Sequence, residues 1–88
     1  MTIMDYRKYR GVPNALRECR ERRGLTQDAV GRMLGLKDGT WVSRWESGEI
    51  LPNLISAIKL AILLDAPVAD LFPDIVSSIR SAIVHQPN

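Results

Sequence analysis

The sequence predicts a small all-α protein, and three observations carry this prediction. The chain has 88 residues, which is the size of one domain and leaves no room for a second. Its apolar residues recur at the three- and four-residue spacing of helices, and no segment alternates with the two-residue period of a strand over a useful length. Its glycines and prolines fall between these segments, where helices are expected to stop and start.

A basic and aromatic segment precedes the first expected helix. Within residues 1–13, two tyrosines are interspersed with three basic residues in the order Tyr6, Arg7, Lys8, Tyr9 and Arg10. We expect this segment to be a flexible arm. Its cations could follow the phosphates or the minor groove of a nucleic acid, or the arm could be a plain disordered tail.

The first two helices are separated by Gly24. Pro13 and Asn14 supply the start of the first helix, and Gly24 stops it. Thr26 is expected to cap the second helix, which runs to residue 34, because its side-chain oxygen can accept a free amide of the first turn. The expected inward faces are Leu16, Cys19 and Arg23 in the first helix, and Val30, Met33 and Leu34 in the second.

Four more helices follow, each with its own start signal. Thr40 is expected to cap a third helix that ends at Gly48. The later helices are expected at residues 52–65, 67–72 and from residue 73 onward, with a frayed tail at residues 85–88. Their apolar residues at helical spacing are Leu54, Ala57, Ile58, Ala61 and Leu64 in the fourth helix, and Ile75, Ile79, Ala82 and Ile83 in the sixth.

Charge is distributed unevenly along the chain although the net charge is only +2. Residues 1–48 carry ten basic and six acidic side chains, whereas residues 49–88 carry two basic and four acidic ones. This asymmetry fits an anionic partner, such as a nucleic acid, that docks on the first half. A solvated basic face would have the same composition, so charge leaves both interpretations open.

The composition argues against disulfides, metal centres and membrane spans. A single cysteine, Cys19, cannot form an internal disulfide, and with a single histidine, His85, it cannot form a Cys/His metal cluster. The densest apolar stretch, residues 54–64, is shorter than the roughly 20 residues that a membrane span needs. We therefore expect a cytoplasmic protein without cofactor, metal ion, targeting segment or membrane contact.

No arrangement of residues points to catalysis. The sequence offers no nucleophile with a matching base, no pair of acid–base carboxylates and no glycine loop that could cradle phosphate. Gly31, Gly35 and Gly39 are evenly spaced, but they lie on a helix and its turn without the strand that a dinucleotide site requires. We expect the protein not to be an enzyme.

The second and third helices have the layout of a helix-turn-helix motif. They are short, at residues 26–34 and 40–47, and a tight glycine-containing turn joins them. In the third helix Val42 and Trp45 fall on one side, while Thr40, Arg44 and Ser47 line the opposite side with Ser43 beside them. Short polar side chains around one arginine can approach a DNA major groove closely, and arginine can bond guanine O6 and N7 together.

Residues 16–72 resemble the Cro and lambda-repressor-like (XRE-type) DNA-binding domains. The resemblance rests on short motifs in the expected order and spacing: LRECRE at 16–21, GLTQDAV at 24–30, VSRWESG at 42–48, PNL at 52–54, KLA at 59–61 and DLF at 70–72. It implies a compact five-helix bundle over residues 14–72, and residues 73–88 add a C-terminal helix and tail. The implied function is a sequence-specific, double-stranded DNA-binding regulator of transcription, a dimeric repressor that reads an inverted-repeat operator with the helix at residues 40–47.

The resemblance also assigns roles to single residues. Those matching DNA-contacting positions are Gln27, Lys37, Gly39, Thr40, Trp41, Ser43, Arg44 and Ser47. Among them Gln27 would hold a phosphate, the glycine, the threonine and the arginine would face bases, and the tryptophan and both serines would lie nearer the backbone. Trp41 could equally be a partly buried prop. Arg20 and Glu46 match an ion pair that joins the first helix to the third.

Two features depart from the family pattern around the turn. The connection at residues 37–40 looks one residue longer than usual, which leaves open whether Gly39 or Thr40 reaches a base. Gly31 stands where the family prefers alanine, and a close approach between helices would explain a small residue there.

Apolar residues in the last helices suggest a dimer. Ile55 and Ile62 occupy positions of the fourth helix that are commonly polar in the family. With Ile75, Ile79 and Ile83 of the sixth helix they make more apolar surface than a small monomer readily hides. We expect these five isoleucines to form a homodimer interface, and simple packing onto the domain is the alternative.

Two other functions remain open at this point. An antitoxin would bind its own operator with the helix-turn-helix and a toxin protein with the apolar stripe. A protein-interaction module would keep the fold without binding DNA, and the modest net charge of +2 favours that interpretation.

Overall fold

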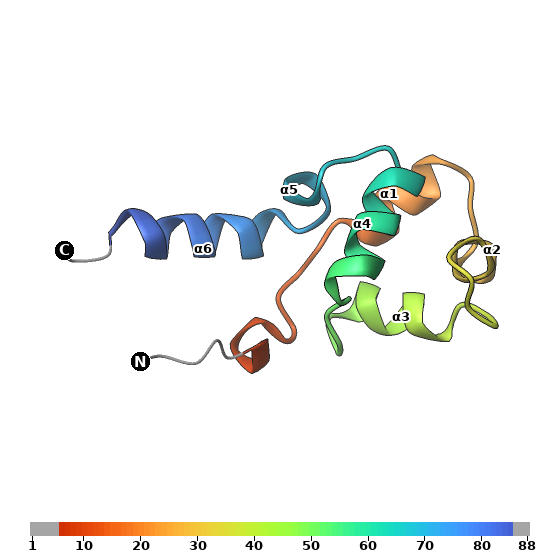
Figure 1. The fold of residues 1–88 in the computed structure, drawn as a ribbon, viewed down its shortest axis with the longest axis horizontal. Coiled ribbons are helices and arrows are strands. Elements are labelled where there is room, and N and C mark those ends of the chain that lie inside the picture. The colour runs from red at the N-terminus through yellow and green to blue at the C-terminus, as the bar shows by residue number, and fades with distance from the viewer. Residues whose placement is uncertain (1–5, 86–88) are drawn as a thin grey trace.

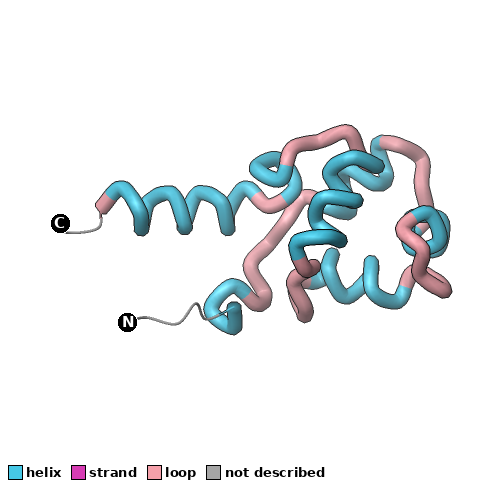
Figure 2. Tube along the Cα trace, viewed as in Figure 1, coloured by secondary structure: helices cyan, strands magenta, loops and turns pink. Residues whose placement is uncertain are grey.

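The computed structural model describes residues 6–85, and this part of the chain is helical, with no strand (Figures 1 and 2). The predicted all-α fold is confirmed. Its elements in order are the 3-10 helix η1 (Tyr6–Tyr9) and the α-helices α1 (Leu16–Arg22), α2 (Gln27–Met33), α3 (Thr40–Ser47), α4 (Leu54–Leu63), α5 (Val68–Leu71) and α6 (Pro73–Val84). The expectations for residues 1–5 of the arm and 86–88 of the tail lie outside the described residues.

The side-chain cap predicted at Thr26 is present, and α4 has a similar cap that was not predicted. The Thr26 hydroxyl accepts the backbone N–H of Ala29 at 3.0 Å, which satisfies a free amide in the first turn of α2. Asn53 caps α4 in the same way, because its side-chain oxygen accepts the N–H of Ser56 at 2.8 Å. At the C-terminal end of α3, Gly48 ends the helix in the left-handed conformation, with φ +80°.

The predicted cap of α3 is wrong by a residue. Thr40 is the first residue of the helix, and Gly39 occupies the capping position without a side chain to use. Asp38 supplies the acceptor instead, because its carboxylate oxygen Oδ1 accepts the Thr40 N–H at 2.9 Å. An aspartate two residues before a helical amide reaches that amide easily, and a charged acceptor competes well with a hydroxyl.

Helices α1 to α5 enclose the hydrophobic core. Its buried side chains come from each of these helices or from the residues that end them: Leu16, Cys19, Val30, Leu34, Val42, Trp45, Leu60, Leu64, Leu71 and Phe72. The N–H of Ala15 donates to the carbonyl of Leu71 at 2.9 Å, which ties the start of α1 to α5. The core therefore lies directly behind the two helices of the predicted motif.

The predicted inward face of α2 is wrong at Met33, which is 60% exposed. Val30 and Leu34 are buried as predicted, but the third buried position of the helix is Gly31. At 100° per residue these three positions centre the buried face about 100° away from Met33. The methionine therefore lies at the edge of the helix and faces solvent. Arg23 is also exposed, because it follows the last residue of α1 and its long side chain extends into solvent.

The predicted face of α4 is wrong in a similar way. Leu54 and Ile58 are exposed, and the centre of the buried face is Leu60, with Leu64 one turn further on. This helix is apolar on both sides, so helical periodicity alone could not show which side packs. The side opposite the core is a stripe of exposed apolar residues, Leu54, Ile55, Ile58 and Ile62, which we call the α4 stripe.

Helix α6 projects away from the bundle (Figure 1, blue ribbon). The molecule measures 46 × 21 × 20 Å along its principal axes, and α6 extends along the longest one. None of the twelve residues of α6 is buried. Ile75 at its start packs partly on the core, whereas Ile79 and Ile83 are exposed.

Gly31 is needed because the connection between α2 and α3 passes directly over it. A Cβ atom at this position would lie 2.0 Å from the backbone carbonyl oxygen of Asp38. The close approach that we expected between helices is made instead by the backbone of the connection, at Asp38 and Gly39. Such an overlap can be relieved only by moving the backbone.

We predict that Gly31→Ala destabilises the protein by about 1 to 3 kcal/mol, the usual cost of overpacking. The steric cost should exceed the gain of about 1 kcal/mol in helix propensity that alanine brings. Urea denaturation would measure the free energy of unfolding, with Arg32→Ala on the exposed side of the same helix as the control, where we expect a change within about 0.5 kcal/mol. A stabilised Gly31→Ala variant would show that the connection can move freely.

Candidate nucleic-acid interface

Helix α3 divides into a buried side and an exposed polar side. Val42 and Trp45 are 2% and 5% exposed, and they anchor the helix in the core as predicted. The opposite side carries five exposed residues, Thr40, Trp41, Ser43, Arg44 and Ser47, which we call the α3 face. Four of these side chains are uncharged and Arg44 is the cation among them.

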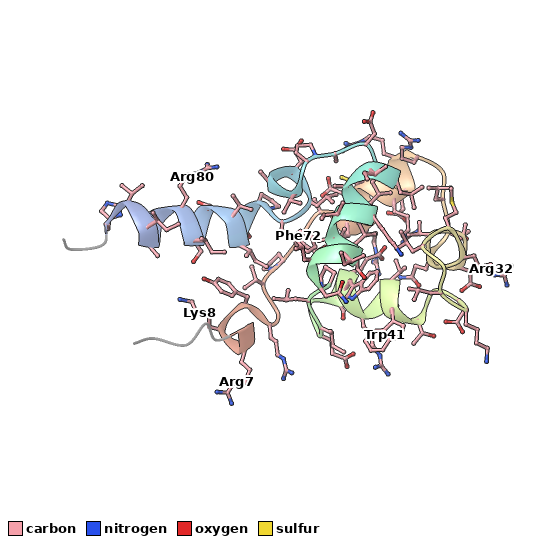
Figure 3. All side chains as sticks on the ribbon, viewed as in Figure 1. Arg7, Lys8, Arg32, Trp41, Phe72 and Arg80 are labelled. Carbon is pink, nitrogen blue, oxygen red and sulfur yellow. The ribbon has the colours of Figure 1, made fainter. Side chains whose placement is uncertain are left out.

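Arg44 is held in place by two neighbours on the surface. Its guanidinium carbon lies 5.3 Å from the centroid of the Trp41 ring, which is a cation–π contact. Its Nε lies 3.5 Å from a carboxylate oxygen of Glu49. Trp41 projects from the outer surface of α3 (Figure 3) and is 43% exposed, so it supports Arg44 from the outside of the bundle. These contacts restrict the arginine to a smaller range of conformations.

The turn before α3 is fixed by carboxylates. The Gly39 N–H donates to the Asp28 side chain at 2.8 Å, and the Thr40 N–H donates to Asp38. The bond from the Thr40 backbone holds the pKa of Asp38 below its ordinary value. Gly39 is buried, and a Cβ there would lie 2.6 Å from the backbone carbon of Gln27. Gly39 therefore has the structural role of letting the start of α3 approach α2, and Lys37 lies exposed beside it.

Gln27 begins α2 and points back toward α3. Its side-chain nitrogen donates to Glu46 Oε1 at 3.0 Å, so one amide proton is committed inside the protein. A side-chain amide has a second proton and a carbonyl oxygen, which leaves capacity for another partner. This bond places the start of α2 against the inner side of α3.

Arg20 and Glu46 form a nearly buried ion pair between α1 and α3. Arg20 donates through Nε and Nη2 to the two carboxylate oxygens, at 2.5 and 3.1 Å, in the two-point geometry typical of strong arginine–carboxylate pairs. Its Nη1 donates to the carbonyl of Leu25 at 2.8 Å. Arg17, at the surface, approaches the same carboxylate at 3.5 Å. The Glu46 side chain is only 2% exposed.

The pKa values of the pair show how its charges are balanced. The hydrogen bond to Glu46 raises the pKa of Arg20 above its ordinary value, against the opposing effect of burial. Burial alone would raise the pKa of Glu46. The hydrogen bonds from Arg20 and Gln27, together with the charge of Arg20, lower this pKa by more than burial raises it, so the net shift is downward. Both side chains therefore stay charged at neutral pH.

Asn14 is a positioning residue whose role sequence reasoning missed. It was recognised as a helix start, and its side-chain oxygen does accept the Leu16 N–H at 3.0 Å. Its amide nitrogen also donates to the Trp45 carbonyl at 2.9 Å, which joins the start of α1 to the C-terminal half of α3. No local pattern could reveal this contact, since the two residues are 31 positions apart in the sequence.

The five isoleucines expected at a dimer interface are not gathered in one place. Ile55 and Ile62 belong to the α4 stripe and are strongly exposed. Ile79 and Ile83 are exposed on α6, where with Val76, Arg80 and Val84 they line a shallow groove whose surface is mostly apolar and which we call the α6 groove. Ile75 packs on the core of its own chain.

The structure offers no sign of a metal site or a membrane span within residues 6–85. No three side chains of histidine, cysteine, aspartate and glutamate lie close enough together to hold a metal ion there. In the same range no helix is both long and apolar enough to cross a bilayer. Cys19 is buried in the core, as predicted for a small apolar residue.

The chain matches the sequence profile of a known protein family. The sequence profile of the helix-turn-helix family, of the XRE (lambda-repressor-like) type, matches residues 16–71, which is more than half of the chain. The matched region runs from the start of α1 to the end of α5 and thus contains the α3 face and the Arg20–Glu46 pair. A search of curated proteins found no match.

We predict that Glu46→Gln destabilises the protein by about 3 to 5 kcal/mol, because it leaves the charge of Arg20 nearly buried without a counter-ion. Urea denaturation at neutral pH would measure this loss. The control is Glu49→Gln, which breaks only an exposed ion pair and should cost less than about 1 kcal/mol.

The same variant also tests the pKa of Glu46. The pKa of Glu46 is lower in the folded protein than in the unfolded chain, where it is about 4.3. The stabilisation that ionised Glu46 provides is therefore complete above the unfolded pKa and is lost as the pH falls through the folded pKa. The stability difference between the parent protein and Glu46→Gln should therefore shrink at acidic pH. A difference that stays constant down to the acid transition would contradict a lowered pKa.

Proposed function

We propose that this chain, which belongs to the XRE (lambda-repressor-like) helix-turn-helix family of DNA-binding regulators, recognises a specific double-stranded DNA sequence through α3 and represses transcription as a dimer. The family is DNA-binding and typically not enzymatic. Family membership supports DNA binding and regulation. The sequence specificity, the dimer and the repression are the proposal. Residues of this chain support the first two, and repression is proposed as the consequence of a dimer bound at a promoter.

One observation carries the proposed sequence specificity. The α3 face is exposed and has short polar side chains around Arg44, while the other side of the helix is anchored in the core through Val42 and Trp45. A helix with this division can enter a major groove without moving the bundle. The stacking of Arg44 on Trp41 restricts the guanidinium before DNA arrives, which lowers the entropic cost of a two-point bond to guanine.

We propose the following division of the remaining contacts. Thr40 and Arg44 are proposed to face bases, and Lys37, Trp41, Ser43 and Ser47 to contact the sugar-phosphate backbone. Gln27 can bond a phosphate through its second amide proton while the first stays on Glu46. Gly39 is buried, so its proposed contribution is the close approach of α2 and α3.

A homodimer would hide the apolar surface that the monomer leaves exposed. The α4 stripe and the α6 groove both face solvent, and α6 extends from the bundle with none of its residues buried. A helix of twelve residues is marginal in water on its own, so packing against a second copy would stabilise it. A two-fold dimer would place two α3 helices about 34 Å apart, one turn of B-DNA, which fits an inverted-repeat operator. Repression would follow if the bound dimer blocks access to the promoter.

The first experiment is selection from a random double-stranded DNA library with the purified protein at near-physiological salt. We expect an inverted repeat to be enriched. On that duplex, Arg44→Ala should lose about 1 to 3 kcal/mol of discrimination against a mismatched base pair, measured by fluorescence anisotropy. The matched control, Arg22→Ala, removes the same charge from the exposed end of α1 and should leave discrimination unchanged.

Two results would contradict sequence-specific recognition by α3. A pool without an enriched sequence would argue for a protein-interaction module. Full discrimination in Arg44→Ala would place the reading residue elsewhere.

A second prediction concerns the dimer. Ile79→Glu places a charge in the α6 groove, and because an unpaired charge is costly in an apolar interface, we expect the variant to sediment as a monomer in analytical ultracentrifugation. Val68→Glu introduces the same charge at an exposed position on α5 and should remain dimeric. A dimeric Ile79→Glu variant would remove α6 from the interface. A monomeric parent protein would refute the dimer itself.

A further inference from the structure

We propose that the basic turn at η1 is a second DNA contact, which binds backbone phosphates beside the groove that α3 enters. This inference rests on the proposed function and adds a phosphate-binding site to it. We call residues 6–11 the η1 arm; its cations are Arg7, Lys8 and Arg10.

The η1 arm is attached to the C-terminal end of α3. The Gly11 N–H donates to the carbonyl oxygen of Gly48, which ends the helix, at 2.9 Å. The two glycines pack so closely that a Cβ on Gly48 would lie 3.1 Å from the Cα of Gly11. The Arg10 N–H donates to the Arg7 carbonyl, and the N–H of Val12, directly after the arm, donates to the Tyr9 carbonyl. These two bonds close the turn. The arm therefore has a defined position relative to α3.

The η1 arm carries concentrated positive charge. Arg7, Lys8 and Arg10 are all exposed, and residues 1–17 contain one acidic residue, Asp5, against four arginines and lysines. The Lys8 ammonium lies over the Tyr9 ring, 5.2 Å from the ring centroid, in a cation–π contact. This segment thus places three exposed cations next to the end of the proposed reading helix.

The η1 arm lies on the same side of the molecule as the α3 face. In Figure 3, Arg7 and Trp41 both project toward the lower side of the view, whereas Arg80 on α6 projects toward the upper side. DNA that contacts the α3 face would therefore meet the arm at its flank. Exposed arginine and lysine side chains in such a position neutralise phosphates, and this adds affinity without reading sequence.

The salt dependence of binding tests this inference. Each phosphate contact contributes about −0.9 to the slope of log Kobs against log salt concentration. We expect the triple variant R7A/K8A/R10A to reduce the steepness of this slope by about 2 to 3 per protomer on the duplex enriched by selection. Discrimination between matched and mismatched duplexes should stay at the parent value, in contrast to Arg44→Ala.

The control triple is R22A/R23A/R32A. It removes the same charge from exposed positions on and next to α1 and on α2, and should leave the slope nearly unchanged. Circular dichroism would establish that both triples are folded, and R7Q/K8Q/R10Q should reproduce the loss of slope if charge is the cause.

Three outcomes would overturn the inference, and they differ in what else they affect. An unchanged slope in the arm triple, with a parent protein that binds the duplex, would refute the η1 contact alone. Equal losses in both triples would assign the effect to net charge and would also refute the contact. A parent protein that binds no duplex would refute the proposed function itself and with it the contact that depends on it.

Discussion

The nearly buried carboxylate of Glu46 is the point on which the arrangement of the first three helices depends. It accepts hydrogen bonds from Arg20 of α1 and Gln27 of α2, and it belongs to α3 itself. Its position in α3, flanking Val42 and Trp45, fixes the rotation of that helix about its axis. The same rotation that directs Glu46 inward directs Arg44 outward. The ion pair therefore determines which side chains form the α3 face, although they do not touch it.

Gly31 and the connection between α2 and α3 form one structural feature. The Asp38 carbonyl of this connection occupies the space that an alanine methyl would take at residue 31. Glycine at residue 31 therefore makes room for the connection. The connection in turn supplies Asp38, which accepts the first amide of α3. A stiff, carboxylate-fixed turn sets the relative position of α2 and α3, so contacts from Gln27 and from the α3 face can be made together.

Local signals in the sequence were enough to place the helices and the polar side of α3. Proline, glycine and capping residues carry such signals over a few positions, and α3 has an apolar side narrow enough to define its orientation. The predicted core faces are wrong where more than one side of a helix is apolar. In α4 both sides are apolar, so Leu54 and Ile58 looked like core. Contacts made by backbone atoms or over long separations, such as Gly11 with Gly48, have no side-chain pattern that could predict them.

The net charge of +2 does not describe the local potential that DNA would meet. Three of the ten acidic side chains are engaged in fixing α3: Glu46 is buried against Arg20, and Asp28 and Asp38 accept backbone amides of the turn. Glu46 and Arg20 neutralise each other, so the local potential depends on where the remaining charged groups lie. Residues 1–17, which include the η1 arm, hold four cations and one acidic residue, Asp5. Charge distribution, rather than net charge, is therefore the quantity that bears on DNA binding here, and it argues against a fold that has lost this function.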